Sequence, residues 1–82
     1  MPLAFILINV EAGAEGRVLN ELKRLEKNRQ AYLREAAVVY GLYDVVASVE
    51  ADDMEQLNAF VADIRKVVNV RNTLTMIVAS GS

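Results

Sequence analysis

Residues 3–10, LAFILINV, form an almost unbroken run of apolar side chains in which Asn9 is the single polar residue. A run of this length without alternation predicts a strand that is covered on both faces. It is too short to cross a bilayer, which takes about 20 apolar residues, and it lacks the basic flank and cleavage site of a signal peptide. We therefore expect a core strand, a cytoplasmic location and no membrane contact.

The next elements follow from the spacing of apolar side chains after Gly13, where the run is broken. Val18, Leu22 and Leu25 recur at helical spacing, with charged residues between them, which predicts an amphipathic helix. Residues 32–40 and 43–50 are rich in strand formers and flank a short loop that contains glycine. Two strands around such a loop predict a β-hairpin.

A second helix is predicted after Asp52 and Asp53, either of which can be the N-cap residue. Its apolar side chains recur at helical spacing, and they are Leu57, Phe60, Val61, Ile64 and Val68. Asn69 is expected to end the helix in the left-handed conformation. Residues 70–79 then alternate as a fourth strand, and residues 79–82 are expected to form a loose tail.

The order strand, helix, strand, strand, helix, strand predicts an α+β fold, the ferredoxin-like βαββαβ sandwich, as a single domain over residues 1–82. Right-handed crossovers place both helices on one face of a four-stranded antiparallel sheet. We expect the helices to cover Val45, Ala47, Val49, Leu74, Met76 and Val78. The open face is expected to carry Val46, Ser48, Thr73, Thr75 and Ile77, with either Phe5 and Leu7 or Ile6 and Ile8 from the first strand.

This open face predicts association between copies of the chain. A domain of 82 residues is marginal alone, and the absence of Cys and His excludes disulfides, iron–sulfur clusters and the usual zinc sites as supports. A four-stranded face of about 800 Å² is half of a standard interface. With 54% hydrophobic residues to bury, we expect a homo-oligomer that dimerises through its sheet.

The same composition narrows the function. A net charge of −2 without a basic stripe disfavours direct nucleic-acid binding. Glu50, Asp52 and Asp53 lie close together in the sequence, but helix capping explains the two aspartates better than a metal site. The chain has neither His nor Cys and shows no converging pair of carboxylates, so the usual candidates for a positioned base are absent. We expect no enzyme activity, no metal and no cofactor.

Three segments in this order resemble a known family: residues 4–8 followed by Gly13 and Val18, residues 39–53 beginning VYGLYDVVA, and residues 64–78 ending VRNTLTMIV. The GxYD loop and the TxT strand are similar to those of the effector-binding module, the RAM domain, of Lrp/AsnC transcription regulators. The resemblance covers residues 3–79. Residues 26–32 form a longer connection than the family's, Asn69 stands where glycine is common, and the helix-turn-helix domain is missing, so the chain looks like a stand-alone RAM module.

The resemblance implies dimers with facing sheets, further assembly into rings of dimers, and amino-acid effectors bound at contacts between dimers. It implies a ligand site at Gly41, Leu42, Tyr43, Asp44, Thr73 and Thr75. The chemistry fits: Asp44 can accept from the ligand ammonium, loop N–H groups can bind its carboxylate, and threonine hydroxyls can complete a small polar pocket.

Each of these residues also has a purely structural interpretation. Gly41 can serve the turn alone, Asp44 can cap the hairpin, and both threonines are ordinary strand formers. As a function, we expect an amino-acid sensor that modulates full-length Lrp/AsnC regulators through mixed oligomers. A structural oligomer without ligand and a small dimeric α/β-barrel enzyme remain the alternatives.

Overall fold

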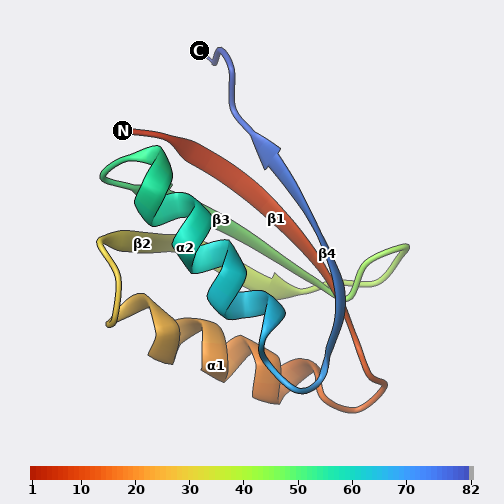
Figure 1. Ribbon diagram of the computed structural model, residues 1–82. Helices are drawn as coiled ribbons and strands as arrows, with labels where there is room; N and C mark the ends of the chain where they lie inside the picture. Colours follow the sequence, from red (N-terminus) through yellow and green to blue (C-terminus); the bar gives the residue numbers. More distant parts are fainter. Residues whose placement is uncertain (82) are drawn as a thin grey trace.

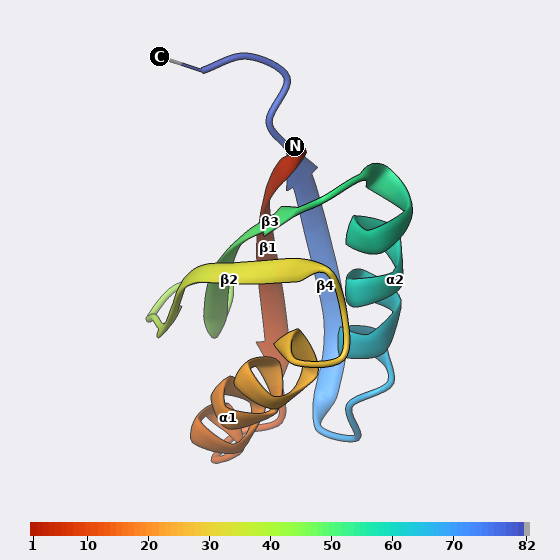
Figure 2. The ribbon, with the colours of Figure 1, turned by 90° about the vertical axis from the view of Figure 1, so that its left-hand side faces the viewer.

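The computed structural model describes residues 1–81, and its elements follow the predicted order (Figure 1). They are β1 (Leu3–Val10), α1 (Glu15–Glu26), β2 (Ala31–Val38), β3 (Val45–Ala51), α2 (Met54–Arg65) and β4 (Val70–Ile77). The four strands form one antiparallel sheet in the order β2-β3-β1-β4. Both helices lie on one side of it (Figures 1 and 2), and the shortest extent of the molecule, 17 Å, corresponds to two layers. The ferredoxin-like sandwich is confirmed.

The core lies between the sheet and the two helices. The central strands β1 and β3 each send alternate side chains into it, and Ile6 and Ile8 of β1 are completely buried. The helices contribute the stripes that the sequence predicts, Val18, Leu22 and Leu25 from α1 and Leu57, Phe60 and Ile64 from α2. Phe5 and Leu7 therefore point away from the helices, which decides between the two orientations left open for the first strand.

The two ends of α2 show which aspartate is the N-cap residue and whether Asn69 adopts the left-handed conformation. Asp53 is the N-cap residue, and its carboxylate accepts a hydrogen bond of 2.8 Å from the Gln56 N–H. At the other end, Asn69 is not left-handed, because within residues 1–81 only Gly13 and Gly41 have positive φ. Its carbonyl instead accepts a hydrogen bond from the Glu11 N–H, which ties the α2–β4 loop to the end of β1.

The second helix ends before Val68, which is expected in its apolar stripe, and β4 ends at Ile77, before the end at residue 79 expected for the fourth strand. Val68 lies beyond the end of α2 with its side chain exposed, so it is not part of the apolar stripe. Residues 79–81 belong to no helix or strand, as expected of a tail, and residue 82 lies outside the described residues. No helix within residues 1–81 combines the length and the apolar character needed to span a membrane.

The fourth strand shows the main error of the sequence prediction. Leu74 pairs with Leu7 of β1, and Thr75 pairs with the buried Ile6. Residues directly opposite in a sheet share a face. Leu74 and Met76 therefore lie on the open face, 45% and 48% exposed, whereas Thr73, Thr75 and Ile77 lie on the helix side.

A β-bulge explains the error. Val10 pairs with Val70 and Asn9 pairs with Asn72, which leaves Arg71 as an extra residue without a partner. Val70 packs against the core, and simple alternation would put Leu74 on the same side. One inserted residue reverses the facing of every residue after it.

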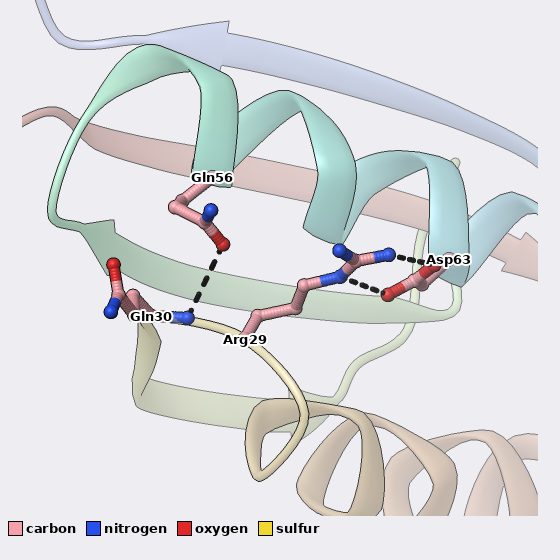
Figure 3. Close-up of polar contacts among 4 residues, drawn as sticks. All are labelled: Arg29, Gln30, Gln56 and Asp63. Carbon is pink, nitrogen blue, oxygen red and sulfur yellow. Dashed lines mark hydrogen bonds and ion pairs between the residues drawn. The ribbon is translucent and has the colours of Figure 1, made fainter.

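The connection between α1 and β2, residues 27–30, is fastened to the rest of the fold by hydrogen bonds, and Figure 3 shows those with Gln56 and Asp63. Arg29 donates two hydrogen bonds to Asp63 of α2, at 2.8 and 3.1 Å. The Gln30 N–H donates to the side-chain oxygen of Gln56 at 3.4 Å, and the Gln30 carbonyl accepts from the Asp52 N–H at 3.0 Å. These bonds tie the α1–β2 connection to α2 and to Asp52, which lies before that helix.

Candidate functional site

Asp44 lies at the end of the β2–β3 loop and fixes that loop to β1. Its Oδ2 accepts a hydrogen bond of 2.9 Å from the Val10 N–H, and its own N–H donates to the Ile8 carbonyl at 3.0 Å. The Val39 N–H donates to the Asp44 carbonyl and closes the loop. The structural role of the Asp44 carboxylate therefore differs from the expected cap on the hairpin, because its partner is an N–H of β1. Within residues 1–81 this role occupies Oδ2, and Oδ1 has no hydrogen-bond donor.

The rest of the GxYD segment lies in a loop that extends beyond the sheet (Figure 1). Gly41 has a φ of 144°, a conformation that side chains rarely adopt, so the turn itself needs glycine. Tyr43 is half-buried, but Tyr40 and Leu42 are almost fully exposed, at 104% and 91%. Two large apolar side chains on a projecting loop are suited to contact with another molecule.

A hollow of about 260 Å³ adjoins the Asp44 carboxylate. We call it the Asp44 hollow. Its walls are formed by Asn9, Val10, Asp44, Arg71 and Asn72. It lies where β1, β4 and the start of β3 meet. The bulge in β4 places Arg71 in this wall, and bulges commonly redirect a side chain next to a functional site.

A second hollow, of about 250 Å³, lies on the other side of Arg71 and Asn72. We call it the arginine hollow. Its walls are formed by Arg65, Val70, Arg71, Asn72 and Thr73. The two hollows share Arg71 and Asn72 and therefore adjoin. Arg65 is the last residue of α2 and reaches this place because the helix ends beside the start of β4.

The structure thus brings together only part of the predicted site. Asp44 and Thr73 line adjoining hollows, whereas Gly41, Leu42 and Tyr43 belong to the walls of neither. Thr75 lines neither hollow and lies on the helix side of β4, opposite Ile6. In one copy of the chain, the loop and the second threonine are therefore separate from the polar hollows.

Sequence reasoning missed Arg65, Arg71 and Asn72. Arg71 and Asn72 stand immediately before the TxT segment, so they are neighbours of a motif residue in the sequence. Alternation in a regular strand, however, gives no reason to expect Arg71 in a hollow with Asp44. The available signal was chemical. A site for an amino acid needs a cation for the carboxylate as well as an acceptor for the ammonium, and Arg71 is a cation beside the motif.

The charges around the Asp44 hollow are complementary to a zwitterion. The unengaged oxygen of Asp44 can accept from an ammonium group, and the Arg71 guanidinium can bind a carboxylate in bidentate fashion. The Asn9 and Asn72 amides can both donate and accept. An amino acid carries one group of each charge, so these two side chains have the chemistry to bind it.

The open face of the sheet is a second candidate interaction surface. Its exposed apolar side chains include Phe5 of β1 and Leu74 and Met76 of β4. A hollow of about 270 Å³ lies in this face, and its walls are Phe5, Glu35, Ala37, Val39, Val46 and Ser48. With Thr73 and Thr75 on the helix side, this face is more apolar than the sequence analysis expected.

Comparison with known proteins places these features in a family. The chain matches the family described as the Lrp/AsnC ligand binding domain over residues 3–81. It is 37% identical over 76 residues to the HTH-type transcriptional regulator FL11 of Pyrococcus abyssi, and the match covers 93% of this chain and 47% of that protein. The chain therefore spans about half the length of this regulator.

Two solved structures show the same fold. The crystal structure of FFRP-DM1 is similar with a TM-score of 0.83 and 38% identity, over 95% of this chain and 99% of that one. The feast or famine regulatory protein of M. tuberculosis, complexed with L-methionine, is similar with a TM-score of 0.70 and 19% identity, over 99% of this chain and 52% of that one. At this lower identity the likeness concerns the fold.

Proposed function

Since the chain belongs to the Lrp/AsnC ligand-binding domain family, we propose that it senses a small molecule, an amino acid, and that the ligand alters its assembly with other chains. The observation that carries the proposal is the meeting of Asp44 and Arg71 in the wall of one hollow. These two side chains supply the acceptor and the cation that a zwitterion needs. A relative with the same fold has been solved with L-methionine, which supports the ligand class.

In this proposal the GxYD loop belongs to the site through a neighbouring copy. Gly41, Leu42 and Tyr43 are outside the walls of the Asp44 hollow of their own chain, and Leu42 is exposed. A loop that projects with exposed apolar side chains can close a hollow on an adjacent molecule. Thr73 lines the neighbouring hollow of its own chain, and Thr75 acts through the packing of β4.

We further propose that the chain forms homo-oligomers through the open face of its sheet. The exposed side chains of Phe5, Leu74 and Met76 lie on this face, and the hollow beside Phe5 can accept a side chain from a partner. Burying about 800 Å² on each copy gives a standard interface. Mixed assembly with full-length regulators of the family would then transmit the presence of ligand to transcription.

Calorimetry of the purified chain with each of the twenty amino acids tests the ligand. The key variant is Asp44→Asn, because the amide oxygen still accepts from the Val10 N–H while the negative charge is lost. We expect at least one amino acid to bind, and the variant to bind it about tenfold or more weakly, as fits a hydrogen bond to a charged group. Asp52→Asn, an exposed carboxylate outside both hollows, is the matched control.

The outcomes separate this proposal from a purely structural oligomer. If no amino acid gives heat and the mass of the assembly is the same with and without each of them, the sensing function is wrong. If an amino acid binds but Asp44→Asn binds it as tightly as the wild type, the site lies elsewhere on the chain.

A further inference from the structure

The sheet order β2-β3-β1-β4 makes β2 and β4 the two edge strands. An edge strand presents a row of backbone N–H and C=O groups that no neighbouring strand binds. Folded proteins protect such an edge with charges, bulges or a covering segment, because an unprotected edge pairs with strands of other chains. The two edges of this sheet differ in that protection.

The β2 edge is protected in several ways. The Glu26 carboxylate accepts a hydrogen bond of 2.6 Å from the Leu33 N–H, and α1 packs against the strand. Arg34 and Glu35 put two charges into β2, and the pairing with β3 changes register between Leu33 and Glu35. These features oppose the addition of another strand at this edge.

The β4 edge lacks such features beyond the bulge at Arg71. Residues 72–79, NTLTMIVA, contain no charged residue and no proline. The pairing of residues 72–77 with β1 runs without a register shift, so this part of the edge is a regular strand. A regular, uncharged edge strand is the kind that pairs with a further strand.

The direction of the backbone groups shows what this edge offers. The Val78 N–H donates to the Leu3 carbonyl at 2.9 Å, so Val78 directs its backbone groups at β1. In an antiparallel pair these groups alternate along the strand between one edge and the other. Thr73, Thr75 and Ile77 therefore direct their N–H and C=O groups to the outer edge, where no strand of residues 1–81 lies beyond them.

We propose that this edge pairs with the same edge of a second copy of the chain, antiparallel, about a two-fold axis at Thr75. In that register Thr75 lies opposite Thr75 of the partner subunit, and Thr73 lies opposite Ile77 of the partner subunit. Each of these pairs exchanges two backbone hydrogen bonds, so every outward group of the three residues gains a partner. The two sheets become one continuous sheet across both copies.

The side chains suit a second copy as the occupant. The register puts Leu74 beside Met76 of the partner subunit on the open face, where both side chains are half-exposed in one copy. Apolar pairs across neighbouring strands stabilise a sheet, and no like charges meet, because residues 72–78 carry none. The unprotected edge is thus complementary to itself.

This contact goes beyond the proposed function and does not depend on it. The two-fold axis is perpendicular to the sheet, so all helices stay on one side and the two open faces join into one surface. Edge pairing is therefore compatible with the proposed contact between open faces and provides a second, separate interface.

Amide hydrogen exchange of the assembled wild-type chain, read residue by residue by NMR, tests the contact without a substitution. With an unpaired β4 edge, Leu74 and Met76 are protected by β1, whereas Thr73 and Thr75 exchange almost as fast as in an unstructured peptide. We expect Thr73 and Thr75 to exchange at least about a hundredfold more slowly than such a peptide. Fast exchange at both positions overturns the inference.

Thr75→Pro tests the same contact by substitution. It removes an outward N–H and places a ring in the path of the added strand, while the ladder with β1 keeps its hydrogen bonds. Thr75→Val, which loses the hydroxyl but keeps the N–H, is the matched control. We expect sedimentation equilibrium to give the proline variant about half the mass of the wild type, and the valine variant an unchanged mass.

Phe5→Glu separates this interface from the open face, because Phe5 is exposed on β1 and away from the edge. We expect each of Phe5→Glu and Thr75→Pro to reduce the assembly and the double variant to be a monomer. If Thr75→Pro keeps the circular dichroism spectrum and the mass of the wild type, the edge contact is wrong while the open-face contact stands. If Thr75→Pro does not fold, the exchange of Thr73 and Thr75 in the wild type decides.

Discussion

Arg29 in the α1–β2 connection and Asp63 of α2 form a two-point ion pair, with nitrogen–oxygen distances of 2.8 and 3.1 Å. The hydrogen bond from Arg29 lowers the pKa of Asp63, and the positive charges of Arg29 and Lys66 act in the same direction. The two residues are separated by 34 positions in the chain. The pair therefore ties the α1–β2 connection to α2.

The lowered pKa gives this pair a defined pH dependence. Because the folded-state pKa of Asp63 lies below its unfolded value, its contribution to stability is fully present above the unfolded pKa of about 4. It is lost as the pH falls through the folded-state pKa. We expect Asp63→Asn to lower the melting temperature at pH 7, and the difference from wild type to shrink as the pH drops below about 4.

Thermal melts between pH 7 and pH 3 measure this effect. Asp52→Asn is the control, because the carboxylate of Asp52 is exposed and forms no ion pair within residues 1–81. A constant difference between Asp63→Asn and wild type over the whole pH range would show that the ion pair does not stabilise the fold.

The start of α2 offers a paired test of helix capping. The Asp53 carboxylate accepts from the Gln56 N–H at 2.8 Å, whereas Asp52 contributes its backbone N–H to Gln30. We expect Asp53→Ala to lower the free energy of unfolding by about 1 kcal/mol and Asp52→Ala to change it little. Urea denaturation of the two variants measures both. Equal losses would contradict the assignment of Asp53 as the cap.

If the chain assembles through the open face of its sheet, a charge placed on that face should prevent assembly without unfolding the domain. Leu74 is 45% exposed on that face, so Leu74→Glu puts a charge into the proposed interface while leaving the helix-side core intact. We expect sedimentation to show a smaller species for this variant, with an unchanged circular dichroism spectrum. A charge buried in an interface without a partner is strongly unfavourable.

Ala62→Glu is the matched control for this experiment. Ala62 is an exposed residue of α2, on the opposite layer from the open face, and the substitution adds the same charge. Its assembly should equal that of the wild type. If Leu74→Glu assembles as the wild type does, the association is not through this face.

The sequence was sufficient for the architecture because most of its patterns are local. The spacing of Leu57, Phe60 and Ile64 marks one face of a helix, and the helix buries that face as predicted. The glycine at position 41 stands in the turn of the hairpin, where the backbone has positive φ. Such patterns depend on residues a few positions apart, so they can be recognised without knowledge of the tertiary structure.

The facing of β4 could not be predicted in the same way. A bulge depends on how two strands separated by the whole chain come into register, and the extra residue, Arg71, carries no local signal of it. The consequence reaches the candidate site, because the bulge brings Arg71 beside Asp44 and moves Thr75 to the helix side. Asp44 and Thr73 were found from the motif, whereas the two arginines required the fold.

The last prediction concerns the two carboxylate oxygens of Asp44. One accepts a hydrogen bond within the fold, and the other is proposed to accept one from the ligand. Oδ2 accepts from the N–H of the buried Val10 at 2.9 Å. Asp44→Ala leaves that donor without a partner and should lower the free energy of unfolding by about 1–3 kcal/mol. Asp44→Asn keeps an acceptor there and should lower it by less than half as much, as measured by urea denaturation. If both variants are equally destabilised, the charge of Asp44 itself stabilises the hairpin, and reduced ligand binding by Asp44→Asn would no longer separate the two roles.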